Sequence, residues 1–152
     1  NALIDDLVKL TAESLLKEKK VAIQADLDPK LPKLMSDRGG LRQILVNLMN
    51  NAAEAMMKGG NIYFKTRYRS APLEGSESRG LVEVTVSDDG PGIPEEMKKR
   101  VFEPFVSSKG SGHSGLGLSI VLNLINGLKG NIVCQSEEGK GTRFKIELQV
   151  GK

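Results

Sequence analysis

An acidic pair followed by two glycines ends an apolar stretch, and these residue types together indicate a ligand site. Valine alternates with other residues from Val82 to Val86, as in a strand with one buried face, and Asp88 falls on that face. Gly90 and Gly92 have prolines beside them, so the backbone can turn sharply and come close to a flat ligand. The pattern predicts that Asp88 accepts a hydrogen bond from such a ligand. An ordinary acidic turn after a strand is the alternative interpretation.

Two asparagines on a predicted helix form a second candidate site. Asn47 and Asn51 are four residues apart, so they lie one above the other on the helix surface. Asparagine destabilises a helix interior by about 0.6 kcal/mol relative to alanine, so a function should compensate for it. The functional interpretation is a magnesium site, in which the amide oxygen of Asn51 binds an ion that keeps most of its waters and bridges substrate phosphates. The alternative is a polar helix edge in contact with water.

A glycine-rich segment from Gly110 to Gly117 leads into another apolar helix. In such an arrangement, backbone N–H groups and the helix dipole can hold phosphate. The glycine spacing is not that of a P-loop, and no strand precedes it closely enough for a dinucleotide-binding fold. A hinge without a ligand is the alternative.

These candidate residues depend on alternating helices and strands for their positions. The clearest element is a helix that Asp37 caps and Gly59–Gly60 ends, because its apolar residues recur at intervals of three and four. The other predicted elements are helices up to about 19, over 95–101 and over 115–126, and strands over 21–25, 62–66, 81–87, 132–134 and 142–150.

Composition limits the class of protein. The chain has 152 residues, of which 39% are hydrophobic, and this suffices for a single domain spanning 1–152. Its net charge of +3 is spread along the chain without a basic block, which does not favour nucleic-acid binding. No apolar run approaches about 18 residues, and Cys134 is the single cysteine, so we expect a domain of the reducing cytoplasm. The chain begins at Asn1 directly in a helical pattern, which suggests a fragment of a longer protein whose membrane anchoring stays open.

Five stretches of the sequence stand out, and they are Asn47–Ala52, Asp88–Ile93, Phe102–Phe105, Gly115–Leu118 and Gly139–Phe144. In order and spacing they resemble the sequence boxes of the sensor histidine kinase catalytic domain, a member of the GHKL group. The resemblance covers Asp37 to Val150, and the segment Pro104–Lys109 is most similar to the nitrogen-regulator type. It implies the Bergerat fold, a two-layer α/β sandwich with helices on one face of a mixed β-sheet.

The resemblance also implies a site for ATP and Mg²⁺. Asp88 would bind the adenine amino group, Asn51 would hold the metal, and Asn47 would act as a catalytic residue beside the metal and phosphates. Lys109 is expected to reach a phosphate and to take part in catalysis, within an ATP lid over about 94–114 that becomes ordered when nucleotide binds. The other expected nucleotide-binding residues are Gly90, Gly92, Ile93, Phe102, Phe105, Gly115, Leu116, Gly117, Leu118 and Thr142.

The activity of the resembling family is transfer of the γ-phosphate of ATP to a histidine on a dimerisation hairpin. We expect that hairpin upstream of Asn1, with a response regulator receiver domain as an indirect partner and a homodimer as the full-length assembly. His113 is the only histidine, but Ser114 follows it where an acidic residue is expected, so it is not the expected acceptor. Asn47 stands where related ATPases carry a general-base glutamate, and an amide cannot take up a proton at neutral pH. This difference favours a kinase over an ATPase.

Three other functions stay open for a chain with these boxes. They are a GHKL-type ATPase, a serine/threonine kinase of the anti-sigma type, and a degenerate nucleotide-binding module. The intact set of boxes weighs against the degenerate module, and the length of the lid weighs against the anti-sigma type. Lys98, Lys99 and Arg100 are interpreted as a solvated helix face instead of a phosphate clamp.

Overall fold

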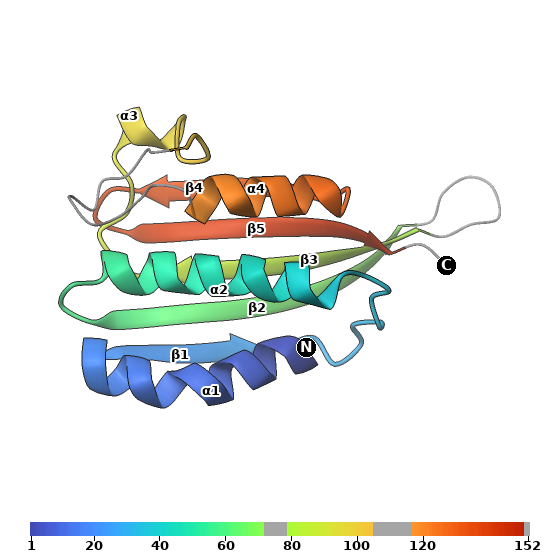
Figure 1. The fold of residues 1–152 in the computed structure, drawn as a ribbon, viewed down its shortest axis with the longest axis horizontal. Coiled ribbons are helices and arrows are strands. Elements are labelled where there is room, and N and C mark those ends of the chain that lie inside the picture. Colours follow the sequence, from blue (N-terminus) through green and yellow to red (C-terminus); the bar gives the residue numbers. More distant parts are fainter. Residues whose placement is uncertain (72–78, 105–116, 151–152) are drawn as a thin grey trace.

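The computed structural model describes residues 1–71, 79–104 and 117–150. None of the helices in these ranges is both long and apolar enough to cross a membrane. Figure 1 shows the elements in chain order, which are α1 (Ala2–Lys19), β1 (Val21–Asp26), α2 (Arg38–Ala55), β2 (Gly60–Ala71), β3 (Arg79–Asp88), α3 (Glu95–Lys98), α4 (Gly117–Gly127), β4 (Asn131–Glu137) and β5 (Gly141–Val150).

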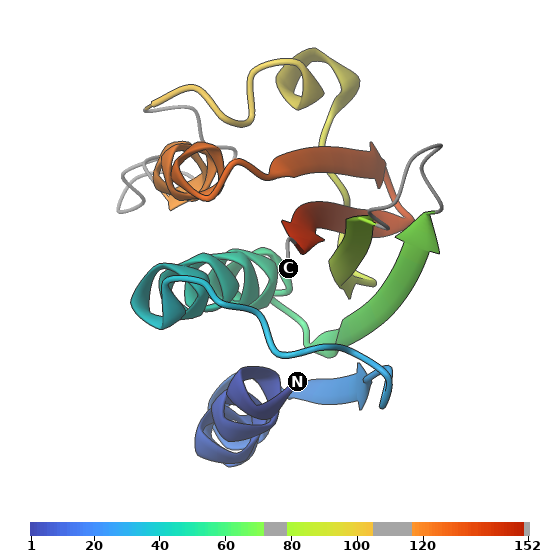
Figure 2. The ribbon, with the colours of Figure 1, turned by 90° about the vertical axis from the view of Figure 1, so that its right-hand side faces the viewer.

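The strands form one mixed sheet in the order β1-β2-β3-β5-β4. β1 and β2 are parallel, while the other three neighbouring pairs are antiparallel. α1, α2 and α4 lie against one face of the sheet, and no described helix covers the other face (Figure 2). The predicted two-layer α/β sandwich with helices on one face of a mixed sheet is therefore confirmed.

The core between the two layers follows from the apolar periodicities. Buried positions on α2 recur three and four residues apart, which places one stripe of the helix against the sheet. On β3, Val86 belongs to the same buried cluster, and Val82 is buried on the same side of the strand. Burial of each such large side chain contributes about 1.5–3 kcal/mol to folding. The buried residues of α2 are Gly40, Ile44, Leu45, Leu48, Met49, Ala52 and Ala53.

Local residues set both ends of α2. Asp37 caps its N-terminus, because the carboxylate accepts a hydrogen bond from the backbone N–H of Gly39 at 3.0 Å. The helix ends at Ala55, and Gly59, with a φ of +85°, then turns the chain towards β2. A side chain at Gly59 would collide with the carbonyl oxygen of Lys20, so this position requires glycine. The predicted N-terminal cap is thus confirmed. The prediction that Gly59–Gly60 ends the helix is wrong, because the helical conformation already stops at Ala55, with Met56 at φ −94° and ψ 73°, and the glycines belong to the turn that follows.

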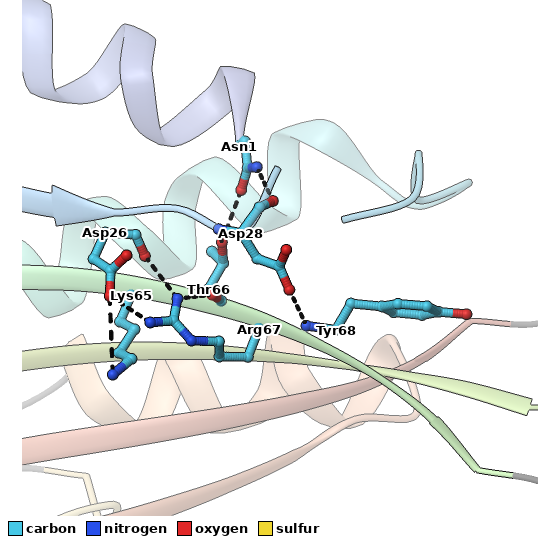
Figure 3. Close-up of polar contacts among 7 residues, drawn as sticks. All are labelled: Asn1, Asp26, Asp28, Lys65, Thr66, Arg67 and Tyr68. Carbon is cyan, nitrogen blue, oxygen red and sulfur yellow. Dashed lines mark hydrogen bonds and ion pairs between the residues drawn. The ribbon is translucent and has the colours of Figure 1, made fainter. Parts of the chain in front are cut away.

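A polar network joins α1 to the sheet away from Asp88 (Figure 3). Thr66 of β2 is buried, and its hydroxyl donates to Oδ1 of Asn1 at 2.8 Å and accepts from the N–H of Asp28 at 3.0 Å. The Asp28 carboxylate accepts hydrogen bonds from the backbone N–H groups of Lys30 and Tyr68, which hold the pKa of that carboxyl below its usual range. The network fixes the start of α1 and the connection after β1 onto β2.

Several predicted elements differ from the structure in length, among them β4, which spans Asn131–Glu137 where a strand over 132–134 was predicted. The helix predicted over 95–101 is only the four-residue α3, and turns follow it. A helix this short makes few internal hydrogen bonds, so contacts with β4 decide where it lies. β2 and β3 are longer than predicted, because their pairing continues from Ile62 opposite Asp88 to Ala71 opposite Arg79. That residues 1–152 form a single domain stays a prediction.

Candidate functional site

Asp88 is the last residue of β3 and is half-buried. It lies on the same side of the strand as Val86, which belongs to the core beneath the helices. Oδ1 of Asp88 accepts a hydrogen bond from the N–H of Gly90 at 2.9 Å, which holds the carboxylate at the start of the turn. In the sheet register Asp88 faces Thr142 on β5. The predicted position of Asp88, at the end of an inward-facing row, is confirmed.

The second carboxylate of the pair has a structural role. Oδ1 of Asp89 accepts from the backbone N–H of Asn61 at 2.7 Å, and Oδ2 accepts from Nδ2 of the same residue at 2.9 Å. The side-chain bond from Asn61 contributes most to holding the pKa of Asp89 below its usual range. This stabilisation is therefore present above the ordinary pKa of an aspartate and is lost as the pH falls. Asp89 fixes the start of β2, which leaves Asp88 as the ligand candidate.

Glycines in the turn after Asp88 permit close packing of backbone. Gly92 has a φ of +75°, and a Cβ there would overlap the carbonyl group of Glu137. The N–H of Gly139 donates to the carbonyl of Pro91 at 2.7 Å, which binds the turn to the β4–β5 hairpin. A Cβ at Gly90 would come within 2.9 Å of both Asp88 Oδ1 and Met56 Cγ. The predicted sharp turn is confirmed, and its glycines are needed for contacts within the protein.

Ser136 on β4 connects this turn to the closing strand, and the sequence reasoning missed it. Its Oγ accepts from the N–H of Ile93 at 2.8 Å and donates to the carbonyl of Gly141 at 3.0 Å. The same oxygen lies 2.9 Å from Oγ1 of Thr142, which is buried. The only signal in the sequence is a small hydroxyl residue two positions after Cys134 on a strand with one buried face.

The asparagines of α2 lie near the start of α4. Oδ1 of Asn47 accepts from Nε2 of Gln43 at 2.8 Å, and Nδ2 of Asn47 lies 3.5 Å from the carbonyl oxygen of Gly117. Gly117 is the exposed first residue of α4, while Leu118 packs against the core. Asn51 is half-buried one turn further along α2, as the spacing predicts. The structure therefore brings Asn47 and Gly117 together, as the resemblance implies.

Phe102 anchors the start of the segment expected to form the lid. Its ring packs edge-on against Phe144, with centroids 6.2 Å apart and planes at 71°. Phe144 lies in the core, and Val101 beside Phe102 is also buried. Four of the expected site residues lie outside the described residues, as do His113 and positions 105–114 of the expected lid, so their roles stay predictions. These four are Phe105, Lys109, Gly115 and Leu116.

Lys98 departs from the predicted solvated helix face, whereas Lys99 and Arg100 are exposed as predicted. Its ammonium donates to the carbonyl of Ser136 at 2.9 Å and pairs with Glu95 at 2.8 Å, so it ties α3 to β4. The long side chain can lie along the protein surface and place its charged end on a carbonyl, which the charge pattern alone does not reveal.

Next to this contact, burial raises the pKa of the Cys134 thiol to about 11, which keeps that thiol neutral at pH 7.

The site combines an inward-facing aspartate, a glycine turn and a helix bearing asparagines. Residues 36–152 match the family described as histidine kinase-, DNA gyrase B-, and HSP90-like ATPase. Since the match covers most of the chain, this chain belongs to that family.

Relatives of this chain include sensory histidine kinases. The sensory histidine kinase/phosphatase NtrB of Rhodobacter capsulatus is 40% identical over 132 residues, which cover 84% of this chain and 37% of NtrB. The NtrB of Escherichia coli O157:H7 is 37% identical over 145 residues, which cover 94% of this chain and 41% of that protein. The predicted similarity to the nitrogen-regulator type is thus confirmed. The chain spans about two fifths of the length of these relatives.

Solved structures agree with this assignment. Full-length ShkA, solved in complex with AMPPNP, has a TM-score of 0.79 and 29% identity, covering 99% of this chain and 30% of ShkA. The catalytic domain of histidine kinase ThkA has a TM-score of 0.76 and 30% identity, covering 97% of this chain and 90% of that domain. The resemblance to the histidine kinase catalytic domain is therefore confirmed in both sequence and fold.

Proposed function

We propose that this chain is the ATP-binding kinase domain of a two-component sensor histidine kinase. In this role it transfers the γ-phosphate of ATP to a histidine on a separate helical hairpin. The observation that carries the proposal is the position of α2, which links the start of α4 to the turn after Asp88.

α2 gives the site two ends. At one end Asn47 contacts the Gly117 carbonyl, and just beyond the other end Met56, the residue that follows α2, lies close to Gly90 in the turn after Asp88. Asn47 and Met56 are nine residues apart, which corresponds to about 13 Å along a helix. This spacing suits a ligand with a base near Asp88 and phosphates near α4, whose first N–H groups and dipole favour negative charge.

The base end is suited to a hydrogen-bond donor on the ligand. A carboxylate accepts hydrogen bonds and donates none, so Asp88 fits the amino group of adenine. The hydrogen bond to Gly90 sets the direction of the carboxylate before the ligand arrives. A charge-assisted bond of this kind is roughly twice as strong as one between neutral groups.

Asn51 lies between these two ends and suits a magnesium ion held jointly with the nucleotide. Mg²⁺ prefers oxygen ligands, keeps several waters and commonly takes the rest from phosphates, so one amide oxygen is an adequate protein contribution. When bound, the ion would neutralise charge on the phosphates. Asn47 stays neutral at all relevant pH values and cannot remove a proton from water. The chain therefore positions ATP but needs a nucleophile from elsewhere.

The partners belong to the proposal as well. They are the upstream acceptor hairpin, a second copy of the full-length protein and, indirectly, a response regulator. The support is that the similar NtrB proteins are longer than this chain and are named histidine kinases. A longer ThkA chain, 28% identical and covered to 40% by this chain, was solved in complex with the response regulator protein TrrA. A cytoplasmic location, where ATP is supplied, is part of the same proposal.

Titration of this chain with ATP, with and without Mg²⁺, tests the nucleotide site. We expect ATP to bind more tightly with Mg²⁺ and to be hydrolysed more slowly than about 0.1 s⁻¹, well below the median enzymatic turnover of about 10 s⁻¹. The reason is that no general base stands at Asn47. Absence of ATP binding would contradict the proposal, and hydrolysis near the median rate would support the GHKL-type ATPase instead.

A further inference from the structure

We propose that Ser136 is a positioning residue for the end of the site near Asp88, where the base of the nucleotide binds. It makes this base end prefer purines with an amino group at position 6 to purines with an oxygen at position 6, which are called 6-oxo purines. It does so by fixing the hydroxyl hydrogen of Thr142, so that Thr142 can only accept hydrogen bonds from a ligand. The inference rests on the proposed ATP site and adds a specificity determinant to it.

The hydrogen bonds of Ser136 determine where each hydroxyl hydrogen points. A serine hydroxyl has one hydrogen to donate and two lone pairs to accept with. Ser136 donates its hydrogen to the Gly141 carbonyl at 3.0 Å, because a carbonyl oxygen can only accept. One lone pair accepts the N–H of Ile93 at 2.8 Å. In the remaining contact, at 2.9 Å, Thr142 must therefore be the donor to Ser136.

This assignment fixes the chemistry that Thr142 offers to a ligand. Its hydrogen is engaged with Ser136, so Oγ1 presents lone pairs only. Thr142 stands opposite Asp88 in the register of β5 and β3, and such cross-strand neighbours have Cβ atoms about 4.5–5.5 Å apart. Asp88 is also an acceptor. The base end thus combines two neighbouring acceptors, which attract the amino group of adenine and repel the O6 acceptor of a 6-oxo purine.

Ser136 is held firmly enough to impose this direction. Lys98 donates to its carbonyl at 2.9 Å, and the strand pairing of β4 with β5 places it opposite Thr142. The Ile93 contact also links it to the turn that begins at Asp88. Removing the Ser136 hydroxyl would release the Thr142 hydrogen, which could then rotate and donate to a ligand oxygen.

Competition titrations with ATP and inosine triphosphate test this inference, because the two nucleotides differ at position 6. For Ser136→Ala we expect the preference for ATP to fall by about tenfold, while ATP affinity itself falls by less than about threefold. Ser136→Thr, which keeps a hydroxyl, should restore most of the preference. Ser87→Ala is the matched control, since Ser87 lies one residue before Asp88 and points to the opposite face of the sheet. It should leave the preference unchanged.

A double mutant separates positioning from a general loss of structure. If Ser136 acts through Thr142, then Ser136→Ala should not change the preference further in a Thr142→Val background. Equal weakening of ATP and inosine triphosphate by Ser136→Ala, or the same loss of preference in both backgrounds, would overturn the inference. If Ser136→Ala does not fold, Ser136→Cys, with a weaker donor and acceptor, should give an intermediate preference, and an unchanged one would overturn it. Failure of the wild-type chain to bind ATP would instead overturn the proposed function on which the inference rests.

Discussion

Replacement of Asp88 by asparagine is expected to weaken ATP binding by about 100-fold, which corresponds to about 2.7 kcal/mol. The substitution keeps the size of the side chain and one oxygen for the Gly90 N–H, whose bond to Oδ1 is 2.9 Å long. It replaces the other oxygen with an NH₂ donor and removes the negative charge. A donor then meets the amino group of adenine, and the charge-assisted bond is lost.

Titration calorimetry with ATP and Mg²⁺ measures this effect, and Asp89→Asn supplies a matched control. Asp89 is the neighbouring carboxylate, but it is exposed and bonded to Asn61, so ATP affinity should change by less than about threefold. Thermal melts of both variants show whether the fold is kept. Wild-type affinity in Asp88→Asn would remove Asp88 from the base end of the site.

Replacement of Asn51 by alanine is expected to reduce phosphate transfer by at least about 100-fold while nucleotide binding partly survives. The metal neutralises charge between the phosphates in the transition state, and Asn51 is the side chain we assign to it. ATP affinity should also become independent of Mg²⁺. The base end of the site, near Asp88, is left intact by this change.

Asn50→Ala is the control for the Asn51 variant. Asn50 is the adjacent residue of α2, but it is exposed, whereas Asn51 is half-buried. Both variants remove one asparagine from the same helical turn, so they gain similarly in helix propensity. Transfer by Asn50→Ala should match the wild type. Transfer at the normal rate by Asn51→Ala would show that Asn51 is not a metal ligand.

The parts of the fold that periodicity controls were predictable from sequence. α2 is an example, since its buried positions recur three and four residues apart and Asp37 marks its start. The inward position of Asp88 was predictable for the same reason, because strand residues alternate between the two faces. Both features depend on neighbours in the chain, which the sequence displays directly.

Contacts between distant strands were not predictable in this way. Ser136 meets Ile93, which is 43 residues away, and this contact exists only because β4 pairs with β5 beside the turn. The different roles of Asp88 and Asp89 depend likewise on Asn61, which lies on another strand. Lys98 was misjudged because its partner is a backbone carbonyl on β4. Such partners are set by sheet register, and no single stretch of sequence encodes them.

The claim that this chain is the ATP-binding half of a histidine kinase is tested most directly by labelling with γ-³²P ATP. The chain is incubated alone, and then with the helical hairpin of its own full-length protein supplied as a separate molecule. We expect no label on this chain and acid-labile label on the hairpin, at a low rate because the tether no longer raises the local concentration. Stable labelling of this chain alone, lost in His113→Ala, would contradict the account, as would an acid-stable label on any partner.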